Sequence, residues 1–371
     1  MATIGKRKPA AAPAVAPAAR PVLRSTADFA RYVGLARTTV SRVLNGQPGL
    51  KRKTIDRVNR ALAETGFTPN AYALHLKGKR TAMIGVCLAD IAAPLAVRKL
   101  AALQRALRER GLSSLIEIAG PEPGASRDAV RRLLSLRVEA VVLVGAFPVE
   151  EIEARIAELV VHGTPHLVLE GPPVKRAHAV ALDRAAGMAA MTAHLLAQGH
   201  RTLGLLGFPE ASGRHDGVSG VRTALASAGL DFGRNVQVID APAPGTRGDA
   251  FEYGRSLAGR VAALPAAARP TALLAYDDVI ALGALRGLQE AGAKLARGIV
   301  VTGFGHHEAA RLALPALASL LVTMDPEIDA STAAAVELLL EGIDTPGRTK
   351  PTVRWITPRL VALKPDPLAR M

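Results

Sequence analysis

Short apolar runs alternate with amphipathic helical stretches from Thr81 almost to the end of the chain. The apolar runs cover residues 83–88, 114–118, 140–144, 166–169, 202–206, 236–239, 272–275, 299–302 and 320–323. The helical stretches lie near 95–110, 126–137, 149–162, 184–198, 216–228, 248–263, 279–291 and 327–341. This alternation is typical of a parallel, doubly wound sheet. Because about 280 residues exceed one comfortable sheet, we expect two α/β subdomains with a cleft between them.

The stretch before residue 81 follows a helical period instead. Two short amphipathic segments flank Gly34, which can take the left-handed backbone that ends one helix and turns into the next. A third helix is expected over residues 54–65, with Thr54 as its N-cap and Gly66 as its stop. These three helices predict a small all-α headpiece over residues 25–67.

The second segment of the headpiece carries a polar face formed by Arg37, Thr38, Ser41 and Arg42. Residues three and four apart are neighbours on a helix, so these side chains point to the same side. Short polar and guanidinium groups are the types that read base edges in a major groove. The pattern favours a DNA-binding helix-turn-helix, and its alternative is an ordinary helical hairpin with a solvated basic face.

Charge distinguishes the headpiece from the rest of the chain. Residues 1–80 contain 16 of the 47 Lys and Arg but only three of the 32 Asp and Glu. The near-neutral remainder therefore carries a strongly basic head, which is typical of a nucleic-acid binder. Attraction to a membrane surface could give the same asymmetry, but no lipidation motif or large basic amphipathic helix accompanies it.

Other sequence features limit the compartment and the chemistry. Cys87 is the only cysteine, so no internal disulfide can form and we expect a reducing, cytoplasmic compartment. No apolar run approaches the roughly 18 residues that a membrane span requires. His162 and His166 have metal-like spacing, but Gly163 and Pro165 break any helix between them. We find no catalytic constellation and expect no enzyme, no cofactor and no metal.

Several motifs together resemble one family. They are residues 39–46 (TVSRVLNG), 69–71 (PNA), 194–201 (HLLAQGHR) with 205–207 (LLG), and 276–283 (YDDVIALG). Their order and type are similar to the LacI/GalR family of bacterial transcriptional regulators over about residues 25–363. The resemblance implies a helix-turn-helix, a hinge helix, and an effector-binding core like periplasmic sugar-binding proteins. It also implies a homodimer that binds a palindromic operator.

The resemblance assigns roles to residues of the headpiece and hinge. Arg37, Thr38 and Arg42 would read base edges, while Thr39, Ser41 and Asn45 would mostly hold phosphates. In the hinge, Asn70, Ala73 and Leu76 would contact DNA, with Leu76 wedging into the central minor-groove step. Two departures are Ala36, where the family usually has Ser or Thr as a cap, and Leu74, where Arg is frequent.

Ligands of such folds lie outside the carboxyl ends of the strands. The candidate ligand-binding residues there are Asp90, Phe147, Glu170, Arg214, His215, Asp277, His306 and His307. Glu170 and Asp277 resemble family positions that bind sugar hydroxyls, although each could also be a loop or helix cap. The histidines and Arg214 could hold a carboxylate or phosphate, or could be exposed loop residues.

Two further departures concern the ligand. Gly217 stands where the family usually has an arginine, and Gly305 stands where it usually has an acidic residue. We therefore expect the effector, a sugar, sugar acid or sugar phosphate, to be held differently from the ligands of better-known sugar repressors. The His306–His307 pair resembles the gluconate-repressor branch.

The sequence thus predicts a basic tail (1–24), a helix-turn-helix domain (25–67), a hinge (68–80), an effector core (81–363) and a tail (364–371). The N-subdomain is expected at about 82–181 and 322–351, and the C-subdomain at about 182–321 and 352–363.

A repressor is the favoured function. The alternatives are a small-molecule-binding protein or enzyme with an incidental basic head, and a nonspecific DNA binder with a vestigial core. Because the tail contains no heptad helix, we expect a dimer and not a tail-zipped tetramer.

Overall fold

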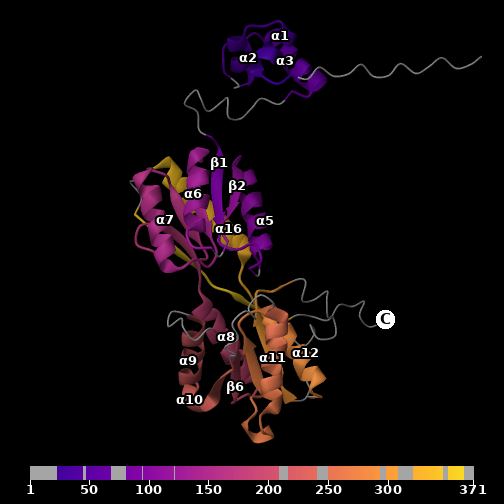
Figure 1. Cartoon of the computed structure of the whole chain (residues 1–371), viewed down its shortest axis with the longest axis vertical. Helices are drawn as coiled ribbons and strands as arrows, with labels where there is room; N and C mark the ends of the chain where they lie inside the picture. The colour runs from indigo at the N-terminus through magenta and orange to yellow at the C-terminus, as the bar shows by residue number, and fades with distance from the viewer. Residues whose placement is uncertain are drawn as a thin grey trace, which may run out of the picture. The chain divides into compact units, whose positions relative to one another are not determined.

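The structure, a computed structural model, describes residues 23–44, 47–67, 81–93, 95–120, 122–208, 216–239, 250–292, 298–307, 321–345 and 350–362. The chain divides into two compact units, Met1–Thr81 and Ala82–Met371. Figure 1 shows a helical first unit, and a second unit built from two sheets with helices on both faces.

The first unit contains helices α1 (Thr26–Val33), α2 (Arg37–Leu44) and α3 (Arg52–Thr65). Gly34 ends α1 with φ 66° and ψ 40°, the left-handed backbone expected from the sequence. The three helices bury Phe29, Val40 and Val58, which are all 0% exposed. The ring of Phe29 also stacks on Phe67 with centroids 4.6 Å apart.

The start of α3 differs from the prediction. The helix begins at Arg52 with Lys51 as its N-cap residue, and no side chain caps it. The amide of Thr54 already donates to the carbonyl of Lys51 at 2.9 Å, so Thr54 lies inside the first turn. The reason is that Lys51 itself takes the extended conformation of a cap, with φ −65° and ψ 135°. The end is as predicted, with the Gly66 amide bonded to the Leu62 carbonyl.

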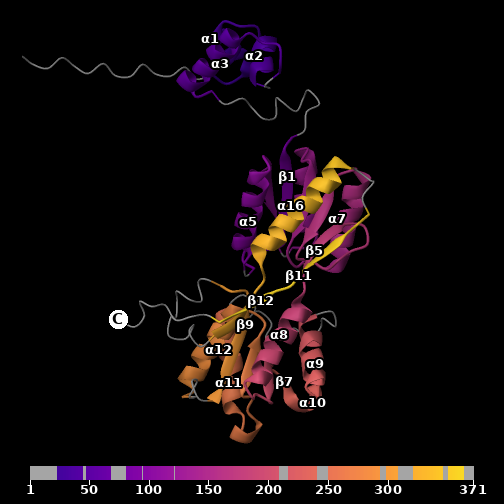
Figure 2. The same cartoon turned by 180° about the vertical axis from the view of Figure 1, so that it is seen from behind.

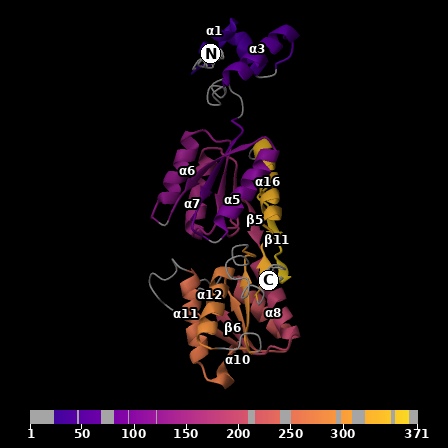
Figure 3. The same ribbon diagram turned by 90° about the vertical axis from the view of Figure 1, so that its right-hand side faces the viewer.

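The N-subdomain is a parallel six-stranded sheet in the order β11-β5-β4-β3-β1-β2. Its strands are β1 (Met83–Leu88), β2 (Ser113–Ile118), β3 (Ala140–Val144), β4 (His166–Leu169), β5 (His178–Leu182) and β11 (Val353–Ile356). Helices α5 (Ala96–Glu109) and α16 (Ile328–Asp344) pack on one face, and α6 (Ala125–Ser135) and α7 (Val149–Val161) on the other. Figures 2 and 3 show α16 lying across the sheet beside α5.

The C-subdomain is a second six-stranded sheet in the order β12-β10-β9-β8-β6-β7, with β12 antiparallel to β10. Its strands are β6 (Leu203–Leu206), β7 (Val236–Ile239), β8 (Ala272–Ala275), β9 (Val300–Phe304), β10 (Leu321–Asp325) and β12 (Arg359–Ala362). One face is covered by α8 (Arg184–Ala197) and α9 (Asp216–Ser227), the other by α11 (Ala250–Ala263) and α12 (Asp278–Glu290). The short α10 (Phe232–Asn235) precedes β7, and a 3₁₀ turn (Ala266–Ala268) precedes β8.

The chain passes between the two subdomains three times: after β5, after β10 and between β11 and β12. The last two crossings come a few residues later than the expected boundaries at 322 and 352. Strand β10 pairs with β9 and so belongs to the C-subdomain, while β11 pairs with β5 and belongs to the N-subdomain. The apolar pattern marked a strand at β10 but could not indicate which sheet it would join.

Three strands of the two sheets were not predicted. Strand β5 is short and buried, but it follows a segment rich in Gly and Pro that indicated only a loop. Strands β11 and β12 lie at sheet edges, where β11 leaves Val353 and Trp355 exposed. Short edge strands with exposed side chains give weak sequence patterns, because only one face has to be apolar.

Candidate nucleic-acid interface and ligand site

The polar face of α2 is open to solvent. The side chains of Arg37, Thr38 and Arg42 are exposed, and those of Thr39 and Ser41 are half-buried. The opposite face packs through Val40, which anchors the helix against α1 and α3. Packing therefore fixes the rotation of α2 and directs the side chains at 37, 38 and 42 away from the protein.

The two arginines of this face differ in their surroundings. Arg42 Nη2 donates a hydrogen bond to the carbonyl of Pro48 at 3.2 Å, so its guanidinium leans on the loop before α3. Arg37 makes no ion pair or side-chain hydrogen bond within the described residues. Arg37 is thus free to turn toward a base edge, whereas the bond to Pro48 restrains the guanidinium of Arg42 and uses one of its donors. Sequence reasoning did not separate the two.

Four of the predicted DNA contacts, Asn45, Asn70, Ala73 and Leu76, lie outside the described residues. The start of α2 has the expected departure at Ala36. Its methyl group cannot cap the helix, and its carbonyl accepts from the Val40 amide at 3.1 Å.

The carboxyl ends of the second sheet gather around Asp278, whose side chain is 0% exposed. Its Oδ1 accepts from the Thr323 hydroxyl at 2.5 Å, and its Oδ2 accepts from the His307 amide at 2.8 Å. The Thr323 hydroxyl oxygen in turn accepts from the His306 amide at 3.3 Å. Burial raises the pKa of the Asp278 carboxyl to about 6. Asp278 therefore fixes the turn after β9 to strand β10, a role that the sequence did not predict.

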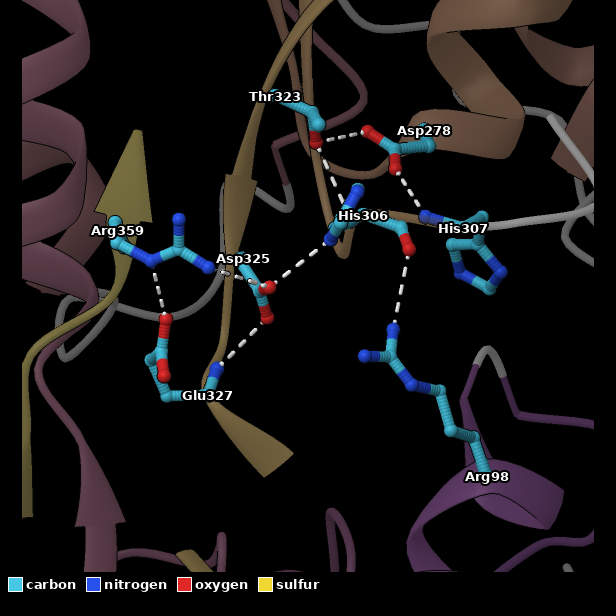
Figure 4. Close-up of polar contacts among 8 residues, drawn as sticks. All are labelled: Arg98, Asp278, His306, His307, Thr323, Asp325, Glu327 and Arg359. Atoms are coloured by element: carbon cyan, nitrogen blue, oxygen red, sulfur yellow. Dashed lines mark hydrogen bonds and ion pairs between the residues drawn. The ribbon is translucent and has the colours of Figure 1, made fainter. Parts of the chain in front are cut away.

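His306 is held in a second group of contacts (Figure 4). Its Nδ1 donates to Asp325 Oδ2 at 2.9 Å, and Asp325 also lies 3.5 Å from Arg359 Nη2. Arg359 Nε bonds Glu327 Oε1 at 2.7 Å. Since Asp325, Glu327 and Arg359 lie at two of the three crossings, His306 joins the strand-end turn to the hinge. The sequence predicted that the His306 imidazole could bind ligand. In the structure its Nδ1 is already bonded to Asp325.

Arg98 of α5 connects the two subdomains at the same turn. Its Nη1 donates to the His306 carbonyl at 3.1 Å, as drawn in Figure 4. His306 has φ 49°, which directs its carbonyl and ring to different partners. The contact needs no special side chain on His306, so no residue pattern could have predicted it.

His307 remains a candidate for ligand contact. Its ring Nε2 is buried and has no hydrogen-bond partner within the described residues. Burial lowers the pKa of its imidazole, and the charges of Arg98 and Lys99 lower it further. A Cβ at Gly305 would lie 2.9 Å from His307 Cδ2, so this ring covers the position where the family usually has an acidic side chain.

Asp277 lies directly before α12 and caps it, since its Oδ1 accepts from the Ile280 amide at 2.8 Å. The cap was the alternative role considered from sequence. Burial raises the pKa of the Asp277 carboxyl, and no cation comes within ion-pair distance of it in the described part of the chain. The side chain can both cap the helix and accept a hydrogen bond from a ligand hydroxyl.

The candidates from the N-subdomain have other roles in this structure. Glu170 Oε2 forms an ion pair with Lys99 Nζ of α5, and both side chains are largely buried. Phe147 is 8% exposed and packs in the core under α6 and α7, and its contact with a ligand stays a prediction. An aromatic residue after a strand can turn inward as easily as outward. Asp90 is exposed and accepts from the Ala92 amide at 2.8 Å, which stabilises its own turn.

Arg214 and His215 lie outside the described residues. Conversely, the structure places Arg184, which was not predicted, at the centre of the strand ends. Its guanidinium lies over the rings of Tyr276 and Phe304, with centroid distances of 4.6 and 4.0 Å. The available signal was an arginine at the first position of a helix that follows a strand, where a basic residue is unfavourable for the helix dipole.

A cavity of ≈ 550 Å³ lies at the other edge of the N-subdomain. It is lined by residues at the ends of α6 and α7 and in the segments that precede β3 and β4: Arg131, Leu134, Ser135, Arg137, Val138, Glu158, His162 and Thr164. Arg131 is paired with Glu158 at 2.9 Å. Parallel α/β sheets bind ligands at the carboxyl ends of their strands, and this cavity is at the amino ends. The candidate ligand site therefore stays at the edge that carries Asp277 and His307, which we call the ligand edge.

The described residues contain no cluster of His, Cys, Asp and Glu suited to a metal ion. Within the same residues, no helix is long and apolar enough to cross a membrane.

Comparisons with known proteins agree with this arrangement. Residues 26–70 match the family described as bacterial regulatory proteins, lacI family, and residues 192–362 match the periplasmic binding protein-like domain. The lactose operon repressor of Escherichia coli strain K12 is 28% identical over 296 residues, which cover 79% of this chain and 78% of that protein. The HTH-type transcriptional regulator DegA of Bacillus subtilis strain 168 is 26% identical over 295 residues, 79% of this chain and 85% of that protein.

Solved structures show the same fold. The lac repressor dimer bound to operator and the anti-inducer ONPF has a TM-score of 0.76 at 23% identity, covering 91% of this chain and 97% of that chain. The complex of the transcriptional regulator CelR with cellobiose has a TM-score of 0.62 at 22% identity, covering 93% and 100%. The predicted fold class, an all-α headpiece with a two-sheet α/β core, is confirmed.

Proposed function

Because the chain belongs to the LacI family of bacterial regulatory proteins, we propose that it represses transcription as a homodimer on a palindromic operator and responds to a small effector. Its coarser role as a DNA-binding transcriptional regulator follows from the family itself. The relatives are regulators and not enzymes, and we propose no catalysis for this chain. A cytoplasmic location fits a protein that binds operator DNA.

The observation that carries the proposal is the α2 face. Arg37, Thr38 and Arg42 are exposed on one side of a helix whose other side is anchored by Val40. A helix of this kind enters the major groove, where an arginine can make two hydrogen bonds to guanine. The excess of Lys and Arg over residues 1–80 supplies nonspecific attraction to phosphates.

The second half of the proposal concerns the core. A small polyhydroxylated effector, a sugar, sugar acid or sugar phosphate, would bind at the carboxyl ends of the strands beside Asp277 and His307. The bond from Arg98 to His306 joins the subdomains at this edge, so a ligand bound there can favour one arrangement of them over another. Coupling of this sort is typically about 1–3 kcal/mol and is reciprocal between ligand and DNA.

The hinge remains a proposal from the sequence. Residues 68–80, with Asn70, Ala73 and Leu76, would form the DNA-contacting link between the two units. We expect Leu76→Ala to weaken operator binding strongly and to leave nonspecific binding almost unchanged, since a wedge acts only where the DNA is kinked. Equal losses on both kinds of DNA would refute the wedge.

The test is selection of bound duplexes from a random pool with the wild-type protein, Arg37→Ala and Arg42→Ala. Arg60→Ala, which removes an exposed charge from α3, is the matched control. Enrichment of a two-fold palindrome, relaxed at defined positions by Arg37→Ala and unchanged by Arg60→Ala, supports sequence-specific readout. A pool that stays random, with binding that only falls with salt, favours the nonspecific DNA binder with a vestigial core. The absence of DNA binding at physiological salt favours the small-molecule-binding protein.

A further inference from the structure

Arg184 lies at the centre of the ligand edge of the C-subdomain. It is the first residue of α8, directly after the crossing from β5. The preceding residue, Asp183, is the N-cap of α8, and its Oδ1 accepts from the Ala186 amide at 2.8 Å. Tyr276 follows β8 and Phe304 ends β9, and the guanidinium lies over both of these rings. Strands β8 and β9 are neighbours in the middle of the sheet, so Arg184 reaches over the middle of its carboxyl edge.

Most hydrogen-bonding capacity of Arg184 is unused. Its Nη1 donates to the Tyr276 carbonyl at 3.2 Å, and no carboxylate lies within ion-pair distance among the described residues. A guanidinium carries five N–H donors in one plane. The two rings hold that plane in place, so a ligand can be bound without further ordering of the side chain.

Gly217 leaves space beside the stem of Arg184. A Cβ at 217 would lie 3.5 Å from Arg184 Cδ and 3.2 Å from Phe208 Cε1. A longer side chain at 217 would therefore compete for the space beside the Arg184 stem. Gly217 has no side chain that could bind a ligand. The positive charge beside it is that of Arg184, the first residue of α8.

The carboxylates at this edge do not neutralise Arg184. Asp278 is bonded to Thr323 and His307, and Asp325 is paired with His306 and Arg359. Glu170, on the N-subdomain side, is paired with Lys99. Asp277 caps α12 and forms no ion pair with Arg184 among the described residues; burial raises the pKa of its carboxyl, and the charge of Arg184 opposes that rise.

A second guanidinium, that of Arg98 in the N-subdomain, contacts the turn after β9. Arg98 donates to the His306 carbonyl and has no carboxylate partner among the described residues. Beside it, the His307 ring carries a buried Nε2 without a partner. The edge thus presents two arginines bonded only to carbonyls, while the acids around them are already paired or serve as a helix cap.

We propose that the effector carries an oxyanion, a carboxylate or a phosphate ester on a small polyol, and that Arg184 binds this group. The proposal rests on the proposed function, because it assumes that the strand-end edge is the effector site. Arg184 holds the anion through its planar donors, and Asp277 accepts a hydroxyl of the same ligand. A planar guanidinium suits both oxyanions, because each presents two oxygens to parallel N–H donors.

The test compares matched ligands on the full-length protein by calorimetric titration and thermal unfolding. The probes are gluconate, glucose 6-phosphate and glucose, and the corresponding galactose set. We expect at least one anionic probe to bind 100-fold or more tightly than its neutral parent. Which anion binds separates a sugar acid from a sugar phosphate.

The variants are Arg184→Gln and Arg184→Lys, with Arg201→Gln as the matched control. Arg201 is in the same subdomain, and its bonds within the described residues also go only to carbonyls, those of Leu196 and His200. It lies before β6 at the opposite edge. Arg184→Gln should remove the preference for the anion, so that the anion and its neutral parent bind with similarly weak affinity. Arg184→Lys keeps the positive charge but loses the planar pair of N–H donors, so it should retain part of the preference for the anion. Arg201→Gln should bind as the wild type does.

Three results would overturn the proposal: a neutral sugar that binds as tightly as its anion, equal losses for Arg184→Gln and Arg201→Gln, or no stabilisation by any anionic probe at millimolar concentration. Unfolding of each variant without ligand separates misfolding from lost binding, and Arg184→Lys gives the answer if Arg184→Gln is unfolded. Operator selection with the same wild-type preparation keeps the two questions apart. A protein that selects an operator but ignores Arg184 retains the proposed function and loses only this inference.

Discussion

The headpiece and the ligand edge of the C-subdomain use polar side chains in opposite ways. On α2, Arg37 and Thr38 stand exposed, and Arg42 has one bond to a neighbouring loop. At the ligand edge, Asp278 is completely buried and His306 is bonded to Asp325. The first surface is therefore a set of nearly independent contacts waiting for a partner, whereas the second is a network in which most groups already support one another. Substitutions should change binding alone in the headpiece and stability in the network.

The largest effect is expected for Asp278→Ala. The substitution leaves the Thr323 hydroxyl and the His307 amide without their acceptor in a buried site. Each such group costs roughly 1–3 kcal/mol, so the free energy of unfolding of the core should fall by about 2–6 kcal/mol. Urea unfolding measures this change.

Asp329→Ala is the matched control for Asp278→Ala. Asp329 also pairs with another side chain, Arg105, but it is 79% exposed. Exposed pairs contribute little, so this variant should change the free energy of unfolding by less than about 1 kcal/mol. If both variants lose the same small amount, the ligand edge is not the cooperative network described here.

The second effect is a pH dependence of core stability. Burial raises the pKa of Asp278 to about 6 in the folded protein, above its unfolded value, so the folded state binds the proton more tightly. The stabilisation that the folded core gains from this tighter proton binding is fully present below the unfolded pKa of Asp278, and it is lost as the pH rises through about 6. It amounts to about 3 kcal/mol at most, because one pKa unit is about 1.4 kcal/mol.

Histidines of the core act in the other direction. Burial lowers the pKa values of His178, His200 and His307, so their contribution is lost as the pH falls through the usual range of histidine. The difference between wild type and Asp278→Asn isolates the carboxyl, since both proteins contain the same histidines. We expect the stability of the wild type relative to this variant to decline between pH 4 and pH 7. A difference that stays constant over this range would contradict the assigned role of Asp278.

In the headpiece, Arg37→Ala should weaken specific operator binding more than Arg42→Ala does. A guanidinium contact to guanine is worth roughly 1–3 kcal/mol, and Arg37 can make it without breaking a bond inside the protein. Arg42 is restrained by the bond from its Nη2 to the Pro48 carbonyl, so turning its donors toward guanine works against that bond. Binding titrations with the selected operator give the order, and urea unfolding should show both variants as stable as the wild type. The reverse order would mean that DNA draws Arg42 away from its loop at little cost.

How far the sequence predicts each region follows from the range of the contacts involved. Helical spacing alone decides that residues 37, 38 and 42 share a face, and the left-handed Gly34 places that face. The strand–helix alternation likewise predicts the two sheets, because each element must bury its own apolar side. The headpiece surface and the fold class were accessible for this reason.

The ligand edge depends on contacts between distant segments. The bond from Thr323 to Asp278 spans 45 residues, and the bond from Arg98 to His306 spans 208. Spacing indicates that His306, Glu170 and Phe147 follow strands, but it does not indicate what each side chain meets there. Tertiary partners decide which groups remain available to a ligand. Arg184 and His307 keep ring or guanidinium nitrogens without a partner among the described residues, whereas the His306 Nδ1 is bonded to Asp325.

The smallest effect tests the bond between the subdomains. Arg98→Ala removes the hydrogen bond to the His306 carbonyl, which should contribute about 1 kcal/mol to the observed arrangement of the two sheets. A change of this size alters the ratio of two arrangements about fivefold without unfolding either one. Distances between dyes placed on one exposed position of each subdomain should therefore spread over a wider range in this variant.

Arg105→Ala provides the comparison for Arg98→Ala on the same helix. Arg105 lies two turns further along α5 and pairs with Asp329 of α16, inside the N-subdomain. It removes the same charge without touching the C-subdomain, so its distance distribution should match that of the wild type. If Arg98→Ala also matches the wild type, the Arg98–His306 bond does not hold the subdomains, and the three chain crossings alone set their arrangement. If only Arg98→Ala differs, one interdomain hydrogen bond at the ligand edge controls the equilibrium that an effector would have to shift.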